Sequence, residues 1–150
     1  NIRPNDSILS PHYNTLSKLN CILASIEANK LGYDEGIMND MNGNISTCNS
    51  TNLFFIKDNT VFTSTGKYCL NGITRGKAIL VCNQNNIACS ETNFTFENIK
   101  NCNEAFVTGT FAGIIPVSQL EGRKLESTNS DSLANKIRML YNQEIQDHIG

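Results

Sequence analysis

Apolar residues recur with helical spacing in three stretches of the chain. The first begins at Thr15 and ends before Gly32, a typical C-terminal cap, and the second covers residues 74–84. The third begins near Ser130 or Asp131, which are both good N-cap residues. The apolar stripes of the first and third stretches consist of Leu16, Leu19, Ile22, Leu23 and Ile26, and of Leu133, Ile137, Leu140, Tyr141 and Ile145. The pattern therefore predicts three helices.

Short apolar runs between turn residues predict the strands. The expected strands are residues 35–40, 53–57, 61–64, 87–92, 105–108 and 114–120. Asn42-Gly43 and Asp58-Asn59 are hairpin turn signals, so we expect the strands before the second helix to form a meander. Residues 96–101 add one or two helical turns. Strand runs broken by single helices are typical of a mixed α/β or α+β domain.

Composition narrows the classes of protein and partner. The chain has 150 residues, which suits one domain, and its formal net charge of -2 predicts no basic face for a nucleic acid. No apolar run approaches the length needed to span a bilayer, so a membrane is not an expected partner either. Residues 1–13 are polar, carry two prolines and are expected to be a linker. Because the chain starts at Asn1 without a signal peptide, we expect a piece of a longer protein.

The six cysteines predict reduced, mostly buried thiols rather than a disulfide framework. No two of them form a CxxC pair, and Cys21, Cys82 and Cys102 lie in or beside apolar runs. Such cysteines are typical of a cytoplasmic protein. A zinc site is disfavoured because the ligand spacing is wrong and the only histidines are His12 and His148.

The segment Asn71-Gly72-Ile73-Thr74-Arg75 precedes the second helix and predicts a site for an anion. Glycine permits a tight turn, and the first amides of a helix point outward at the positive end of its dipole. A second run of small residues, 108–113, follows a short strand and can supply further donors. The two runs together predict that the chain holds the phosphate of a small molecule. The alternative is that Gly72 and Gly109 are turn glycines with no further role.

These residues resemble the fold-type IV pyridoxal-phosphate enzymes, which are the class IV aminotransferases, including branched-chain and D-amino-acid aminotransferases, and aminodeoxychorismate lyase. The matching motifs are residues 26–28, 32–35, 42–55, 70–75 and 108–117. The likeness covers nearly the whole chain and is to the second half of such an enzyme. It implies that residues 14–150 form the barrel-like C-terminal α/β domain of the D-amino-acid aminotransferase-like fold. It also implies an absent N-terminal domain, a homodimer and the cofactor pyridoxal 5'-phosphate.

The resemblance carries site residues with it. It implies that the backbone and hydroxyl groups of Gly72, Ile73 and Thr74, with Thr110, hold the cofactor phosphate. The substrate carboxylate would lie near the backbone of Phe111 and Ala112, and Asn49 would line the cofactor. These implied roles agree with the anion site that the residues themselves predict.

The first departure from the family concerns the lysine that forms the Schiff base. Counting back from Glu27 places that position at Asn14, and asparagine cannot form a Schiff base. Lys18 is four residues further on, so in a helix it would share a face with Asn14. Its long, flexible side chain can then reach back to the aldehyde carbon. Lys18 is therefore the candidate catalytic lysine; the alternative is a surface or phosphate-side lysine with no covalent role.

The second departure concerns the partner of the pyridine nitrogen. The family usually places a glutamate there, and Thr47 occupies that position. A carboxylate keeps the pyridine protonated and makes it a strong electron sink, whereas a hydroxyl bonded to an unprotonated nitrogen leaves a weaker one. The alternative is that Thr47 is an ordinary strand residue and the alignment is shifted by one or two positions.

The resemblance therefore implies an aminotransferase that moves an amino group between an amino acid and a 2-oxo acid. Two alternatives stay open: a lyase similar to aminodeoxychorismate lyase, and a catalytically degenerate protein that binds pyridoxal phosphate. Because the family's N-terminal domain covers part of this domain, we also expect exposed apolar surface.

Overall fold

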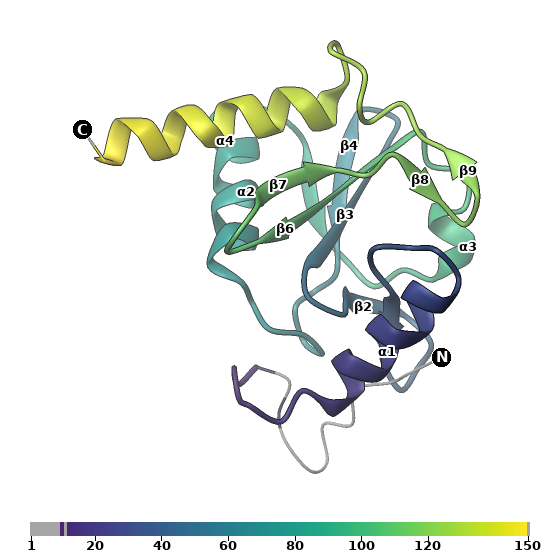
Figure 1. Cartoon of the computed structure of the whole chain (residues 1–150). Coiled ribbons are helices and arrows are strands. Elements are labelled where there is room, and N and C mark those ends of the chain that lie inside the picture. The colour runs from purple at the N-terminus through teal and green to yellow at the C-terminus, as the bar shows by residue number, and fades with distance from the viewer. Residues whose placement is uncertain (1–9, 11, 150) are drawn as a thin grey trace.

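A computed structural model describes residue 10 and residues 12–149 of the chain. Its centre is a five-stranded mixed sheet in the order β5-β4-β3-β6-β7, and two hairpins, β1-β2 and β8-β9, form small sheets of their own (Figure 1). The strands are β1 (Ile37–Asn39), β2 (Ile45–Cys48), β3 (Asn52–Lys57), β4 (Thr60–Thr63), β5 (Cys89–Glu91), β6 (Glu104–Gly109), β7 (Gly113–Pro116), β8 (Gln119–Leu120) and β9 (Arg123–Lys124). The helices are α1 (Leu19–Lys30), α2 (Ile73–Gln84), α3 (Phe96–Ile99) and α4 (Leu133–Ile149). The predicted mixed α/β class is confirmed.

Both predicted hairpin turns are present. Asp58 and Asn59 adopt positive φ angles of 49° and 58° between β3 and β4, as a two-residue turn requires. Gly43, with φ 85°, lies in the turn between β1 and β2, where Asp40 Oδ1 accepts the backbone N–H groups of Asn42 and Asn44. The predicted meander is wrong, because β1 and β2 pair only with each other while β3 pairs with β4 and β6. The polar turn after β2 lets the chain leave the small sheet before β3 begins.

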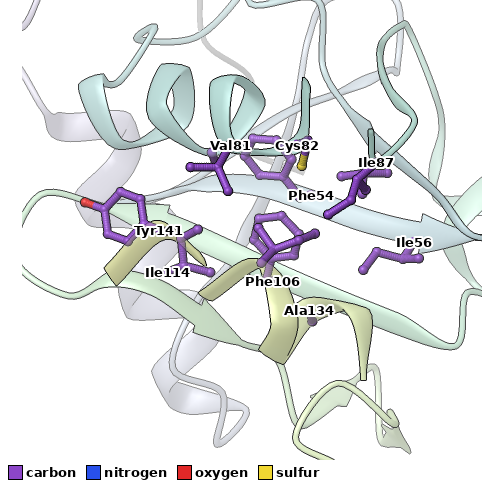
Figure 2. Packing of buried hydrophobic residues seen from close by; sticks show 12 residues of the cluster. Phe54, Ile56, Val81, Cys82, Ile87, Phe106, Ile114, Ala134 and Tyr141 are labelled. Atoms are coloured by element: carbon purple, nitrogen blue, oxygen red, sulfur yellow. The ribbon is translucent and has the colours of Figure 1, made fainter. Parts of the chain in front are cut away.

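The main core lies between the five-stranded sheet and the helices α2 and α4. The rings of Phe54 and Phe106, from neighbouring strands, are stacked at 4.7 Å and fully buried. Figure 2 shows them between Val81 and Cys82 of α2 and Ala134 of α4. The predicted stripe of the last helix is confirmed, because each of its members is buried in this cluster or packs against it: Leu133, Ile137, Leu140, Tyr141 and Ile145. A second cluster, which includes Phe55, Phe94 and Ile99, fills the opposite face of the sheet.

The first helix differs from its prediction at its start and on its surface. It begins at Leu19, not at Thr15, and Lys18 is its N-cap residue without a side-chain capping bond. Its end is as expected: Gly32 has φ 82°, its N–H bonds to Asn29 O, and the next N–H bonds to Ala28 O in a Schellman arrangement. The apolar stripe faces outward, because five of its side chains are exposed: Leu16, Leu19, Ile22, Leu23 and Ile26. Exposed apolar surface was expected from the sequence, and α1 supplies it.

Three other expectations concern short features. The last helix is capped by Ser132, whose Oγ accepts the N–H of Asn135, so the cap lies one or two residues later than expected. The strand predicted over 114–120 is divided into β7 and β8. The predicted linker, residues 1–13, lies outside the described residues except at positions 10, 12 and 13.

All six cysteines are free thiols, and four of them are buried. No three His, Cys, Asp or Glu side chains come together as a metal site would require within the described part of the chain. In the same residues, no helix combines the length and the apolar character that crossing a bilayer needs.

Candidate functional site

A cavity of about 400 Å³ lies where the start of α1 meets the hairpin β1-β2 and the start of β3. Its volume falls in the range of about 300–1,000 Å³ that is usual for small-molecule sites. Four parts of the chain form the wall: residues 10, 13–15 and 17–21, Met38, residues 47–52 and residues 68–70. Segments far apart in the sequence therefore converge on one site, at the lower end of the molecule in Figure 1.

Asn14 and Lys18 both line this cavity. The argument that they share a helical face is wrong, because the helix begins only after Lys18. The intervening residues instead form a compact non-helical segment, in which the N–H of Lys18 donates to Leu16 O at 2.9 Å. The fold thus brings the lysine side chain to the site by a route that the helical argument did not foresee.

Thr47 also lines the cavity, and its hydroxyl already has a partner. Thr47 Oγ1 donates to Thr51 O at 2.8 Å, and the N–H of Cys48 donates to the same carbonyl oxygen at 2.9 Å. A hydroxyl has one proton to donate, so toward the cavity Thr47 presents only acceptor lone pairs. The expectation that it donates to an unprotonated ring nitrogen does not fit this geometry.

Asn49 braces the wall of the cavity rather than pointing a free amide oxygen into it. Its Oδ1 accepts the N–H of Gly36 at 2.6 Å, and its own N–H donates to Gly36 O at 3.0 Å. The neighbouring Ser50 is held in the same way, since its hydroxyl and its N–H both donate to the carboxylate of Glu35. These contacts fix the turn after β2 to the loop after α1.

The N-terminus of α2 lies directly beside the wall. Gly72 is the N-cap residue, and a Cβ there would come within 2.8 Å of Asn52 Oδ1. Asn52 is a buried wall residue, and its Nδ2 donates to Leu70 O at 3.0 Å and contacts Cys69 Sγ at 3.6 Å. The absence of a side chain at position 72 therefore lets the helix approach the cavity. Its first amides supply the hydrogen-bond donors that an anion needs.

The residues around Gly72 differ in their exposure to solvent. The side chain of Ile73 is 85% exposed and Thr74 is buried, and the wall of the cavity ends two residues before Gly72. Arg75 does not line the cavity; its Nη2 donates to Ser64 O and to Glu91 Oε2, both at 2.6 Å. Phosphate held at the helix start would thus lie at the edge of the cavity.

The predicted residues Thr110, Phe111 and Ala112 form an exposed turn between β6 and β7. They are not part of the wall that the described residues form. The turn nevertheless borders the site, because a Cβ on Gly109 would lie 3.3 Å from Cγ2 of the wall residue Thr51.

Sequence reasoning missed Asn52 and Tyr68 in the wall. Asn52 starts a strand of buried apolar residues, and a polar residue at such a position is a signal that it has a partner. Its strand neighbour Thr108 is also buried, and Thr108 Oγ1 has no partner among the described residues. Paired residues of antiparallel strands share a face, so these two polar groups lie on the side of the sheet that α2 covers.

The thiols at the site are poor nucleophiles. Cys21, Cys48 and Cys69 line the cavity, and burial raises the pKa of each. For Cys48 the pKa rises to about 12, first because of burial and then because of the charge of Glu35. All three are therefore protonated at neutral pH, and Lys18 is the lysine that lines the cavity.

The fold and the cavity define an α/β domain with a cavity of small-molecule size beside a helix N-terminus. The sequence model of the family described as Amino-transferase class IV matches residues 1–120. The chain belongs to the class IV aminotransferase family. It is 32% identical over 138 residues to branched-chain-amino-acid aminotransferase-like protein 2 of Arabidopsis thaliana. The matched region is 92% of this chain and 24% of the relative.

Solved structures agree with this assignment. The fold is similar to that of a branched-chain aminotransferase from Thermoproteus uzoniensis, crystallised with norvaline, with a TM-score of 0.89, 28% identity and coverage of 97% of this chain and 49% of that one. It is also similar to an aminotransferase from Brucella abortus bound to the cofactor PLP, with a TM-score of 0.79, 26% identity and coverage of 85% and 45%. The chain thus spans half or less of the length of each of these proteins.

Proposed function

We propose that this chain is the C-terminal cofactor-binding domain, residues 14–150, of a pyridoxal 5'-phosphate-dependent aminotransferase. The reaction would move an amino group between an amino acid and a 2-oxo acid, with branched-chain amino acids as the first substrates to test. The observation that carries the proposal is the cavity itself. Lys18 and Thr47 both line it, and the N-terminus of α2 lies beside its wall. Membership of the family supports the same function.

The groups of the cavity suit the phosphate and the aldehyde of this cofactor. At the ring nitrogen they differ from the usual family site, because Thr47 stands in place of a carboxylate. Bound pyridoxal phosphate supplies an aldehyde carbon and an electron-accepting ring. The amine of Lys18 would bind that carbon and, once released, hold and return the proton of the substrate. Thr47, with its proton committed to Thr51 O, would accept a hydrogen bond from a protonated ring nitrogen.

The phosphate would lie at the edge of the cavity, where the helix amides point outward. The backbone N–H groups after Gly72, at Ile73 and Thr74, would donate to it, and Thr110 would add its hydroxyl. The backbone of Phe111 and Ala112 would bind the substrate carboxylate. Asn49 would act through the wall, since both of its described hydrogen bonds go to Gly36.

The complete protein is proposed to be a cytoplasmic homodimer with a further domain over the cavity. This proposal is supported by the outward apolar face of α1 and the exposed ring of Phe111, because such apolar surface is usually buried in an interface. The six free thiols suit a reducing compartment. The shorter length of the chain relative to its relatives supports the further domain.

Borohydride trapping tests the role of Lys18. The complete protein is incubated with pyridoxal phosphate, reduced, digested and examined by mass spectrometry. The phosphopyridoxyl mass should appear on the peptide that contains Lys18 and disappear in a Lys18→Ala variant. Lys30→Ala is the matched control, because Lys30 is the lysine at the opposite end of α1 and does not line the cavity. An adduct that survives in Lys18→Ala on another residue would refute the assignment.

Thr47 favours a second candidate, a lyase similar to aminodeoxychorismate lyase, because a hydroxyl supports the protonated ring less strongly than a carboxylate does. The two activities differ in whether they require an amino acceptor. A lyase releases pyruvate from its substrate without an amino acceptor, whereas an aminotransferase requires a 2-oxo acid. Cofactor binding with neither activity would identify a degenerate member of the family.

A further inference from the structure

The buried guanidinium of Arg75 belongs to the first turn of α2 and has two oxygen partners outside that helix. Its side chain is 6% exposed, and its partner Glu91 is the last residue of β5. Arg75 Nη2 donates to Glu91 Oε2 and to Ser64 O, both at 2.6 Å. Glu91 pairs with Thr63 across two parallel strands, so the ion pair fastens the helix start to the edge of the central sheet.

The same contacts continue to the wall of the cavity. Ser64 follows β4, its Oγ donates to Ser46 O at 2.8 Å, and it lies 3.8 Å from Cys69 Sγ. Cys69 in turn contacts Nδ2 of Asn52, whose Oδ1 limits how closely Gly72 can approach. A continuous set of polar contacts therefore runs from Glu91 through Arg75 to both the cavity and the helix N-terminus.

We propose that Arg75 and Glu91 are positioning residues for the phosphate: their ion pair sets where the first amides of α2 stand relative to the cavity wall. This rests on the proposed function, since it assumes that the phosphate binds at that helix start. The physical reason is that amide donors act over hydrogen-bond distances and lose most of their effect when they are displaced or tilted. The Glu91 side chain is 46% exposed, but its contact with the buried guanidinium is charge-assisted and therefore stronger than a neutral hydrogen bond.

The test compares two ligands that differ only in the phosphate. Dissociation constants for pyridoxal phosphate and pyridoxal are measured on the complete protein, and their ratio isolates the contribution of the phosphate. Glu91→Gln removes the charge and keeps the shape. The expected result is a roughly tenfold loss of the preference for pyridoxal phosphate, with little change in the affinity for pyridoxal.

A matched control exists on the same helix. Lys77 of α2 forms an ion pair with Glu144 of α4 at 3.5 Å, away from the wall, so Glu144→Gln should leave the ligand ratio unchanged. Glu91→Asp keeps the carboxylate and should restore most of the preference. An unchanged ratio in Glu91→Gln would overturn the inference and leave the pair a structural contact only. If the unmodified protein itself does not prefer pyridoxal phosphate, the proposed function fails, and the inference fails with it.

Discussion

Gly72→Ala should destabilise the protein, and at this N-cap position alanine is also a poorer residue than glycine. The backbone at Gly72 has φ -61° and ψ 145°, which alanine adopts without strain. The difficulty is the added methyl group, which would lie 2.8 Å from Asn52 Oδ1. Because Asn52 is buried and bonded to Leu70 O, it cannot move without losing that hydrogen bond.

The expected cost follows from these contacts. Leaving a buried polar group without its partner costs about 1–3 kcal/mol. Against this, replacing glycine reduces the freedom of the unfolded chain and contributes about 0.4–1 kcal/mol of stability. The net effect is a loss of up to about 2.6 kcal/mol, and of about 1.3 kcal/mol at the middle of both ranges. Gly76→Ala, one turn further along α2, should instead stabilise the protein by about 0.8–1 kcal/mol, since nothing lies within 4 Å of its added Cβ.

Equilibrium urea denaturation of the two variants measures this difference. A double-mutant cycle then identifies the cause, because Asn52→Ala removes the atom that the methyl group meets. In that background Gly72→Ala should cost little or become neutral. The reasoning is refuted if Gly72→Ala stabilises the protein as much as Gly76→Ala does, or if its cost is the same with and without Asn52.

Three further outcomes are expected from urea denaturation. Phe106→Ala should lower the free energy of unfolding by about 3–5 kcal/mol because the ring is fully buried and stacked, while an unchanged midpoint would argue against this core. Ser132→Ala should cost about 1–2 kcal/mol, since Ser132 Oγ caps α4 and also donates to Ser127 O; a loss below about 0.3 kcal/mol would show that the cap is dispensable. Burial raises the pKa of Cys48 from 9.0 to about 12, so the unfolded state loses this proton first and the free energy of unfolding should fall as the pH rises from about 9 to 12. Cys48→Ala should make that decline shallower, and an equal decline in the variant would exclude the thiol as its source.

The sequence was most informative where structure depends on neighbouring residues. Asp58-Asn59 sets a two-residue turn by itself, because both residues tolerate positive φ, and Gly32 ends α1 by the same local logic. The stripe of α4 was equally readable, because one helix face packs on one core. The start of α1 was not readable, since Lys18 caps it without a side-chain bond and Thr15 looked like an equally good beginning.

The pairing of the strands and the contacts of the cavity wall could not be predicted from the sequence, because they depend on residues far apart along the chain. The meander prediction failed because β3 takes β6 as its partner, about fifty positions further along the chain, and nothing local encodes that pairing. Asn52 and the pair Arg75–Glu91 were missed for the same reason, since each acquires its role from a contact across the fold. The motif around Gly72 could be predicted as an anion site because a glycine before a helix carries that chemistry in a few adjacent residues.

The wall of the cavity and the chemistry of the cavity depend on different residues. The wall is held by the amide of Asn49 on Gly36 and the amide of Asn52 on Leu70, neither of which involves Asn14. Thr47 contributes one bond to the turn after β2, and the N–H of the next residue makes a second bond to the same carbonyl. Departures from the family at Asn14 and Thr47 therefore leave the shape of the site intact. It follows that the contribution of the phosphate to ligand affinity and the turnover should respond to different substitutions, with the helix start governing the first and Lys18 the second.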